Sequence, residues 1–307
     1  MSGDVSVVIP VYNRADLLPR SIESVLAQTV PAREIIVVDD GSQDGSADVA
    51  SRYGGRVQVI RQQNQGVAAA RNAGICAASG EWVAFLDADD ALLPHAVEKN
   101  LACVHAHPNA GVVYGDAVVV DPHGSAQTLF LDGKPPAEGW VFDRLLNSGF
   151  VNCSAVMVRR KALLDVGLFR AGMRHAEDYE LWLRLARHCE FALVPEPIAV
   201  YYRQPSGLSL NHLGMARGEV SICEELLRQP LTAEQRHNLR CRMARNLFDI
   251  AWELRSNDPA GAVRASLRSV RMNPGRAASW KLLAANTAAW ARRFLPASGT
   301  LAAKPAK

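Results

Sequence analysis

The first 90 residues alternate between short β-branched runs and segments with helical periodicity, and this alternation restricts the fold more than any other feature of the chain. Strands joined by helices of this length are typical of βαβ units, which assemble into a mostly parallel sheet covered by helices. An α/β fold is therefore predicted for this part. The segments expected to be strands are 5–9, 35–38, 57–60 and 82–86, and the helices expected between them include 16–28 and 66–78.

Polar motifs follow three of these expected strands. The first strand, which Pro10 is expected to end, leads into PVYN at 10–13; the second leads into DDGS at 39–42, and the fourth into DADD at 87–90. In a parallel sheet the carboxyl ends of the strands lie at one edge, where ligands bind. The three motifs are therefore expected to open onto one site.

The remaining chain divides near its two-thirds point. An α/β domain is predicted at 1–212, with an irregular loop at 121–140, and a helical region that becomes basic towards its end is predicted at 213–307. The later segments expected to be strands are 112–120, 154–158, 191–194 and 198–202, and the C-terminal helices are expected at 215–229, 233–256, 259–272 and 277–294.

Composition limits the classes of partner. The 307 residues are 49% hydrophobic with a net charge of +3, which is typical of a globular protein. Because there is no array of basic and aromatic residues, nucleic-acid binding is not expected. The six cysteines show no metal-ligand spacing and are expected to be reduced. With neither a signal-peptide pattern nor an apolar run of membrane-spanning length, the chain is expected to act in the cytoplasm.

Asp87 and Asp89 form an Asp-x-Asp pair in the turn after an expected strand. Mg²⁺ or Mn²⁺ takes few protein carboxylates and completes its shell with water and phosphate oxygens. The pair is therefore a candidate metal site, although two loop aspartates are also typical of a turn or a helix cap. Asp90 precedes the helix expected at 94–105 and is interpreted as its cap.

Other side chains on this edge are suited to a nucleoside. Asp39 and Asp40 can accept hydrogen bonds from N–H and hydroxyl groups, and Tyr12 can stack on a base. Arg71 is the one cation in a helix of small residues, and arginine suits a base edge or a phosphate. The alternatives are Asx-turns and helix caps in the loop DDGSQDGS, and a surface ion pair for Arg71.

Together these motifs resemble family 2 glycosyltransferases of the GT-A fold. The resemblance covers about residues 4–210. It implies an inverting transfer of a sugar from a nucleotide diphosphate donor, usually a uridine one, to a saccharide or a polyprenyl-linked acceptor in a bacterial cell-surface glycan. The matching segments are VSVVIPVYNR, SVLAQT, EIIVVDDGSQDGS, GVAAARNAG and WVAFLDADDALLP.

The resemblance also assigns roles by position. Asp87 is placed near the ribose and the metal, and Asp89 is the main ligand of Mn²⁺ or Mg²⁺. Asp178, in the motif EDYELWLRL, is the catalytic base and Glu177 its neighbour. From the residues alone, acids in the first turn of a helix are also favoured by the helix dipole. The residues assigned to the nucleoside are Pro10, Tyr12, Asp40 and Arg71, with Asp39 assisting.

The loop YYRQPSGLSLN follows a late strand and contains Arg203, Ser206 and Ser209. In similar members of the family a polar segment here closes over the diphosphate, so Arg203 is a candidate donor-binding residue. An arginine at the end of a strand is also commonly structural. His175 and His212 are weaker candidates for a further metal ligand, because a lone histidine is more often solvated or held in the core.

The last 49 residues, 259–307, contain nine Lys or Arg and no Asp or Glu, together with several Trp, Leu and Phe residues. This pattern is compatible with a helix on an anionic membrane surface, and therefore with peripheral membrane association. The alternative is an aromatic stripe packed on the catalytic domain. Two other functions stay open: a catalytically degenerate scaffold that acts through the C-terminal helices, and a nucleotidyltransferase, although PVYNRADLL lacks the glycines of a phosphate loop.

Overall fold

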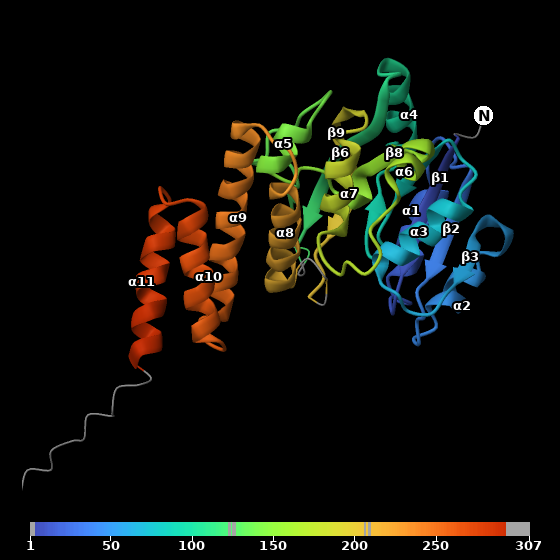
Figure 1. Cartoon of the computed structure of the whole chain (residues 1–307). Coiled ribbons are helices and arrows are strands. Elements are labelled where there is room, and N and C mark those ends of the chain that lie inside the picture. The colour runs from blue at the N-terminus through green and yellow to red at the C-terminus, as the bar shows by residue number, and fades with distance from the viewer. Residues whose placement is uncertain (1–3, 122–123, 125–126, 206, 208–209, 293–307) are drawn as a thin grey trace, which may run out of the picture.

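The structure of the protein is a computed structural model that describes residues 4–121, 124, 127–205, 207 and 210–292. One part is a twisted sheet with helices packed on it, and a row of helices extends from the side of this part (Figure 1). The predicted α/β fold is confirmed. Among the described helices, none is long and apolar enough to cross a membrane.

The described strands form one nine-stranded sheet. They are β1 (Val5–Val11), β2 (Glu34–Asp39), β3 (Gln58–Arg61), β4 (Trp82–Phe85), β5 (Ala91–Leu92), β6 (Ala110–Val120), β7 (Gln127–Leu129), β8 (Val156–Arg159) and β9 (Glu190–Tyr202). The order is β3-β2-β1-β4-β8-β6-β9-β5, and β7 also pairs with β6. Strands β1 to β4 are parallel, as are β6 and β9, whereas β8 is antiparallel to both β4 and β6.

Helices cover both faces of this sheet. Val8 belongs to a hydrophobic cluster with side chains of α3 and α7, whereas Val7 and Ile9 belong to a second cluster with α1 and α4. Strands buried on both faces read as continuous apolar runs, which is why the first strands were visible in the sequence. The helices of this part are α1 (Leu18–Leu26), α2 (Ser46–Ser51), α3 (Val67–Ala77), α4 (Ala96–Ala106), α5 (Phe142–Asn147), α6 (Arg160–Val166) and α7 (Glu177–Leu185).

Three strand predictions were wrong in detail. β1 does not end at Pro10: the proline lacks a donor, but Pro10 still pairs with Val38 and the strand continues to Val11. The two strands expected at 191–194 and 198–202 are one strand, β9, which pairs with β6 along its length and absorbs irregularities in register at Gly115 to Ala117. The loop expected at 121–140 contains β7.

The predicted C-terminal helices are present as α8 (His212–Leu227), α9 (Ala233–Leu254), α10 (Pro259–Met272) and α11 (Ala277–Ala291). They lie side by side in Figure 1. Leu239 and Met243 of α9 belong to the same hydrophobic cluster as Leu145 of α5 and Trp182 of α7. Both parts of the chain thus contribute to one core, and the division at residue 212 stays a prediction.

Candidate functional site

The three polar motifs meet at one edge of the sheet, as predicted. β1 lies between β2 and β4 and is parallel to both, so their carboxyl ends are neighbours. Side chains then join the loops: the main-chain N–H of Asn13 donates to Ser42 Oγ at 3.0 Å, and that of Gln43 donates to Asn13 Oδ1 at 2.9 Å. Asn13 has φ +51°, a left-handed conformation that asparagine tolerates better than most residues.

Asp39 is fully buried at the end of β2. Its Oδ1 accepts a hydrogen bond from the main-chain N–H of Ser42 at 3.1 Å. Its Oδ2 lies 3.3 Å from Nε of Arg61, yet this buried oxygen has no hydrogen-bond partner among the described residues. Because burying an oxygen without a partner is costly, the atom is suited to a donor supplied by a ligand.

Asp40 is also buried, and the loop that leads to α3 occupies its carboxylate. Oδ1 accepts from Gln62 Nε2 at 2.7 Å and from the main-chain N–H of Gln65 at 2.9 Å, and Oδ2 accepts from the main-chain N–H of Gly66 at 2.8 Å. Gly66 precedes α3 with φ +90°. Asp40 therefore fixes the approach to α3, and its assignment to the nucleoside stays a prediction.

Tyr12 and Pro10 lie at the end of β1. Tyr12 is 48% exposed, so its ring is free to contact a ligand at this edge, whereas Pro10 is buried. Arg61, at the end of β3, is exposed beside Asp39. An exposed aromatic ring next to a buried, incompletely bonded carboxylate can provide both stacking and hydrogen bonding to a base.

Arg71 joins two carboxylates that are far apart in the sequence. Its Nη2 donates to Asp87 Oδ1 at 2.7 Å, and its Nη1 donates to Glu177 Oε1 at 2.8 Å. The residue is 3% exposed, and its guanidinium carbon lies 5.3 Å from the centre of the Phe169 ring. The surface ion pair considered from the sequence is thus a buried one.

Asp87 and Asp89 follow β4 directly, in the place predicted for a metal. Burial and the charge of Asp87 raise the pKa of Asp89, and Arg14 Nε lies 3.8 Å from Asp89 Oδ2. Arg20 donates to the main-chain carbonyl of Asp89 and stacks at 3.6 Å on the ring of Tyr202. Within the described part of the chain, no three or more Asp, Glu, His or Cys side chains are arranged as a metal cluster.

The two carboxylates nonetheless fit a hard divalent cation. Such an ion needs only one or two protein carboxylates when phosphate oxygens and water complete its shell. The pKa of Asp89 is raised first by burial and second by repulsion from the negative charge of Asp87. A cation at this position would relieve that repulsion.

Asp90 does not cap the following helix, so that interpretation was wrong. α4 begins at Ala96, and Asp90 is instead buried, where its Oδ1 accepts from the main-chain N–H of Tyr202 at 3.0 Å and its Oδ2 accepts from Ser154 Oγ. Burial, together with the charges of Asp87 and Asp89, raises the pKa of Asp90 well above its usual range. Asp90 ties the DADD turn to the end of β9.

Glu177 and Asp178 begin α7 after Ala176, whose φ is +59°. Glu177 is buried against Arg71, whereas Asp178 stays partly accessible to solvent. Desolvation and the charge of Glu177 raise the pKa of Asp178 to about 7. A carboxylate that titrates near neutral pH is suited to take a proton from an acceptor. The helix dipole also favours an acidic side chain in the first turn of α7. This structural role of Asp178 is compatible with a role as the base.

Arg203 and His175 are two of the remaining candidates, and the structure describes both. Arg203 is exposed immediately after β9, and its main-chain N–H donates to the carbonyl of Val120 at 3.0 Å. Ser206 and Ser209 lie outside the described residues. His175 packs against Gly214 of α8, and its Nε2 lies 3.4 Å from Asn211 Nδ2. The described contacts of His175 are thus with α8.

Four residues of the site were not found from the sequence: Arg14, Arg20, Ser154 and Tyr202. Arg14 lies directly after PVYN, so its proximity to that motif was the available signal. The others reach the DADD turn through contacts between segments 60 or more residues apart, which no local pattern encodes.

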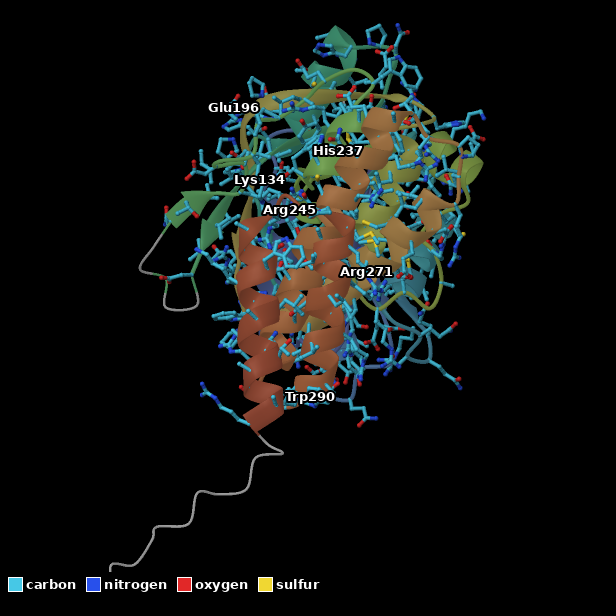
Figure 2. All side chains as sticks on the ribbon, turned by 60° about the vertical axis from the view of Figure 1, so that its left-hand side comes forward. Lys134, Glu196, His237, Arg245, Arg271 and Trp290 are labelled. Atoms are coloured by element: carbon cyan, nitrogen blue, oxygen red, sulfur yellow. The ribbon has the colours of Figure 1, made fainter. Side chains whose placement is uncertain are left out.

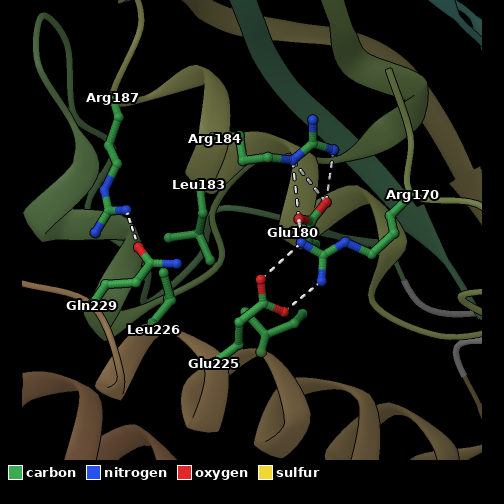
Figure 3. A pocket seen from close by; sticks show the side chains of 9 residues that line it. Arg170, Glu180, Leu183, Arg184, Arg187, Glu225, Leu226 and Gln229 are labelled. Atoms are coloured by element: carbon green, nitrogen blue, oxygen red, sulfur yellow. Dashed lines mark hydrogen bonds and ion pairs between the residues drawn. The ribbon is translucent and has the colours of Figure 1, made fainter. Parts of the chain in front are cut away.

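A small cavity of about 80 Å³ lies elsewhere, between α7 and α8. Figure 3 shows that ion pairs close it: Arg184 pairs with Glu180 at 2.7 Å, and Arg170 pairs with Glu225. Arg187 binds Gln229 at its other side. The charged side chains around this cavity are paired with one another. We therefore interpret it as part of the packing between α7 and α8 and not as a ligand site.

A family model described as "Glycosyl transferase family 2" matches residues 6–167. An uncharacterized glycosyltransferase of Haemophilus influenzae is 28% identical over 239 residues, covering 76% of this chain and 80% of that protein. An uncharacterized glycosyltransferase of Rickettsia felis is 33% identical over 188 residues, and the match spans 60% of this chain but only 31% of that protein. A putative teichuronic acid biosynthesis glycosyltransferase, TuaG of Bacillus subtilis, is 31% identical over 187 residues, covering 60% and 72% of the two chains.

Solved structures of other proteins are similar over most of the chain. S. aureus TarS 1–349 in complex with UDP-GlcNAc has a TM-score of 0.71 at 17% identity, and the match covers 95% of this chain and 92% of that one. The mannosyltransferase PcManGT from Pyrobaculum calidifontis, in complex with GDP-Man and Mn²⁺, has a TM-score of 0.63 at 19% identity and covers 94% and 81%. These likenesses show a shared fold, which is the GT-A fold expected from the sequence.

Proposed function

Since the chain belongs to glycosyltransferase family 2, we propose that it transfers a sugar from a nucleotide diphosphate donor to a hydroxyl group with inversion of configuration. The observation that carries this proposal is the convergence of Asp39, Tyr12 and the DADD turn with the start of α7 around one edge of the sheet. A UDP-sugar is the favoured donor, supported by the UDP-GlcNAc complex of the similar TarS fold.

In this proposal the nucleoside lies against the ends of β1 and β2. Tyr12 stacks on the base, and Oδ2 of Asp39, which pairs with Arg61 but accepts no hydrogen bond from the described residues, accepts one from the base. Pro10 and Asp40 form the floor beneath, with Asp40 holding the loop before α3 in place. Arg203, after β9, is available to the diphosphate.

Asp89, helped by Asp87, would hold Mn²⁺ or Mg²⁺ next to the diphosphate. The bound ion would neutralise charge on the departing diphosphate oxygens. Arg14, close to Asp89, adds a second positive charge on this side. The fit rests on the carboxylates of Asp87 and Asp89, which follow β4 directly and whose side chains are 33% and 22% exposed.

Asp178 is proposed to take the proton from the acceptor hydroxyl as the hydroxyl oxygen bonds to the sugar carbon and the diphosphate leaves from the opposite face. A single displacement of this kind needs one base and no covalent nucleophile. Glu177 stays buried on Arg71 and keeps the first turn of α7 in position. The degenerate-scaffold alternative is not favoured, because the acidic motifs are intact and assembled.

The acceptor is proposed to be a saccharide or a polyprenyl-linked saccharide of a cell-surface glycan, met at the cytoplasmic face of a membrane. Trp252, Trp280 and Trp290 of the C-terminal helices are 49%, 52% and 40% exposed. Figure 2 shows Trp290 at the lower end of α11 and Arg271 higher on the helical part.

Co-sedimentation with lipid vesicles tests the membrane contact. The protein should bind phosphatidylglycerol vesicles in a way that salt reverses, and it should not bind phosphatidylcholine vesicles. Equal recovery of the protein with both kinds of vesicle would refute an electrostatic contact.

A panel of nucleotide sugars tests the enzymatic proposal. The purified protein is incubated with UDP-, GDP- and dTDP-sugars with Mn²⁺, Mg²⁺ or EDTA, and release of the nucleoside diphosphate is measured. We expect metal-dependent release from at least one UDP-sugar. Absence of release, together with absence of UDP binding by calorimetry with either ion, would contradict the proposal.

A further inference from the structure

We propose that Arg71 is a positioning residue that fixes the donor-side DADD turn and the base-bearing start of α7 at a set separation. This inference rests on the proposed function and replaces the direct contact with the nucleoside that the family resemblance implied. Its basis is the buried bridge from Asp87 through Arg71 to Glu177.

The bridge connects three separate elements. Arg71 is on α3, Asp87 follows β4, and Glu177 is the first residue of α7. Each terminal nitrogen of the guanidinium holds one carboxylate, at 2.7 Å and 2.8 Å. Arginine is a planar donor with fixed directions, so binding both carboxylates fixes their relative position more firmly than a lysine ammonium would.

Burial separates Arg71 from a ligand. The side chain is 4% exposed, both Nη atoms are taken up by carboxylates, and the ring of Phe169 lies against the guanidinium. To reach a nucleoside, the side chain would have to leave the partly exposed Asp87 and the buried Glu177 without a partner, and the loss at the buried Glu177 is strongly unfavourable. The bridge is therefore the arrangement that the surrounding residues stabilise.

The position of the bridge matters for the reaction. Asp87 stands next to Asp89 on the diphosphate side, and Glu177 stands next to Asp178 on the acceptor side. Both sides must meet the sugar at once, and a displacement of about 1 Å can cost about 100-fold in rate. Loss of the bridge should lower kcat while the nucleotide, bound mainly at the ends of β1 and β2, keeps its affinity.

The test uses the full chain with Arg71→Lys, Glu177→Gln and the double variant. Arg33→Lys is the matched control, because Arg33 pairs with Asp4 on the surface and precedes β2, at the opposite end of that strand from the site. UDP affinity is measured by calorimetry with and without Mn²⁺, kcat with the best donor, and folding by the thermal midpoint. We expect Arg71→Lys to lower kcat about 100-fold with UDP affinity within about threefold of the wild type.

The double variant separates the proposed role from a contact with the nucleotide. If Arg71 acts through Glu177, the double variant should be no slower than the slower single variant, because both break the same bridge. Additive losses, or a UDP affinity that falls while kcat is kept, would overturn the proposal. If Arg71→Lys does not fold, Glu177→Gln alone decides, and unchanged kcat in that variant would also overturn it. An inactive wild type would instead refute the proposed function.

Discussion

Asp178 titrates close to neutral pH because it is desolvated beside Glu177 at the start of α7. As a base it must be ionised, so kcat at saturating donor should fall about tenfold per pH unit below a pKa of about 7 and level off above it. Measurements of kcat from pH 5.5 to 8.5 at a fixed Mn²⁺ concentration check this fall at low pH. Asp178→Asn should lose transfer at every pH while it still binds UDP in calorimetry.

The raised pKa of Asp178 also makes the stability of the folded protein decrease as the pH rises. Between the ordinary aspartate pKa and about 7, the folded protein keeps a proton that the unfolded chain releases, so this contribution to stability is lost as pH rises through that window. Urea unfolding of the metal-free protein at pH 5.5 and 8 should show a smaller pH effect for Asp178→Asn than for the wild type. An identical pH effect in both would show that Asp178 has no raised pKa.

Asp89→Asn separates metal binding from folding. Burial and Asp87 disfavour the ionised form of Asp89 in the folded protein, so removing that charge should leave the thermal midpoint of the metal-free protein equal or higher at pH 8. Turnover should fall at least about 100-fold, because a metal contributes several kcal/mol to charge stabilisation. Mn²⁺ calorimetry and rates are compared with Asp48→Asn, an exposed aspartate on α2. Wild-type Mn²⁺ affinity in Asp89→Asn would exclude it as a ligand.

At this scale, the sequence predicted residues whose position follows from a strand end, and it missed those that depend on distant contacts. Asp87 and Asp89 were predictable because a parallel strand delivers them to the edge of the sheet. Asp90 was misread because its partners, Ser154 and Tyr202, reach it through the register of later strands. Arg71 looked exposed in a helix of small residues, and only the folded chain places two acids on it.

Among the elements, α3 sets the position of Arg71 by its close packing on β1. A Cβ atom at Gly74 of α3 would overlap with the side chain of Val8, which is fully buried. Gly74→Ala should therefore push α3 from the sheet and lower the free energy of unfolding by about 1–3 kcal/mol, with a loss of kcat as Arg71 moves. Gly55→Ala, where nothing lies within 4 Å, is the control and should change stability by less than about 0.5 kcal/mol. Equal unfolding energies for the two variants would contradict this packing argument.

Elements with strong local patterns were the predictable ones. The buried strands β1, β2 and β4 and the helices α8 to α11 carry their patterns in the sequence. β9 was divided in two because Pro195 and Pro197 interrupt its apolar pattern, yet pairing with β6 continues past them through irregular register. β5 and β7 are two and three residues long and exist only because a neighbouring strand pairs with them.

For the whole molecule, the helical region shares its packing with the α/β part. Arg242 of α9 is buried, donates to Glu219 at 2.9 Å and to the carbonyl of Leu145, and lies 4.1 Å from the centre of the Tyr179 ring. Tyr179 is on α7, one residue beyond Asp178. α9 therefore supports the helix that carries the proposed base, a relation that the sequence alone did not show because it joins segments more than 60 residues apart.

Truncation measures how far the α/β part depends on that support. A chain of residues 1–212 would lose Leu239, Met243 and Leu247 from the shared cluster and would expose their partners on α5 and α7. Each such side chain contributes about 1.5–3 kcal/mol when buried, against a typical total stability of about 5–15 kcal/mol. We expect the truncated chain to lack a cooperative unfolding transition and to lose UDP binding. A chain of residues 1–272, which lacks α11, the turn before it and the residues after it, should keep both, because the buried residues of α11 are only Ser279, Leu282 and Asn286. A stable, UDP-binding fragment 1–212 would instead establish the predicted boundary as that of an independent domain.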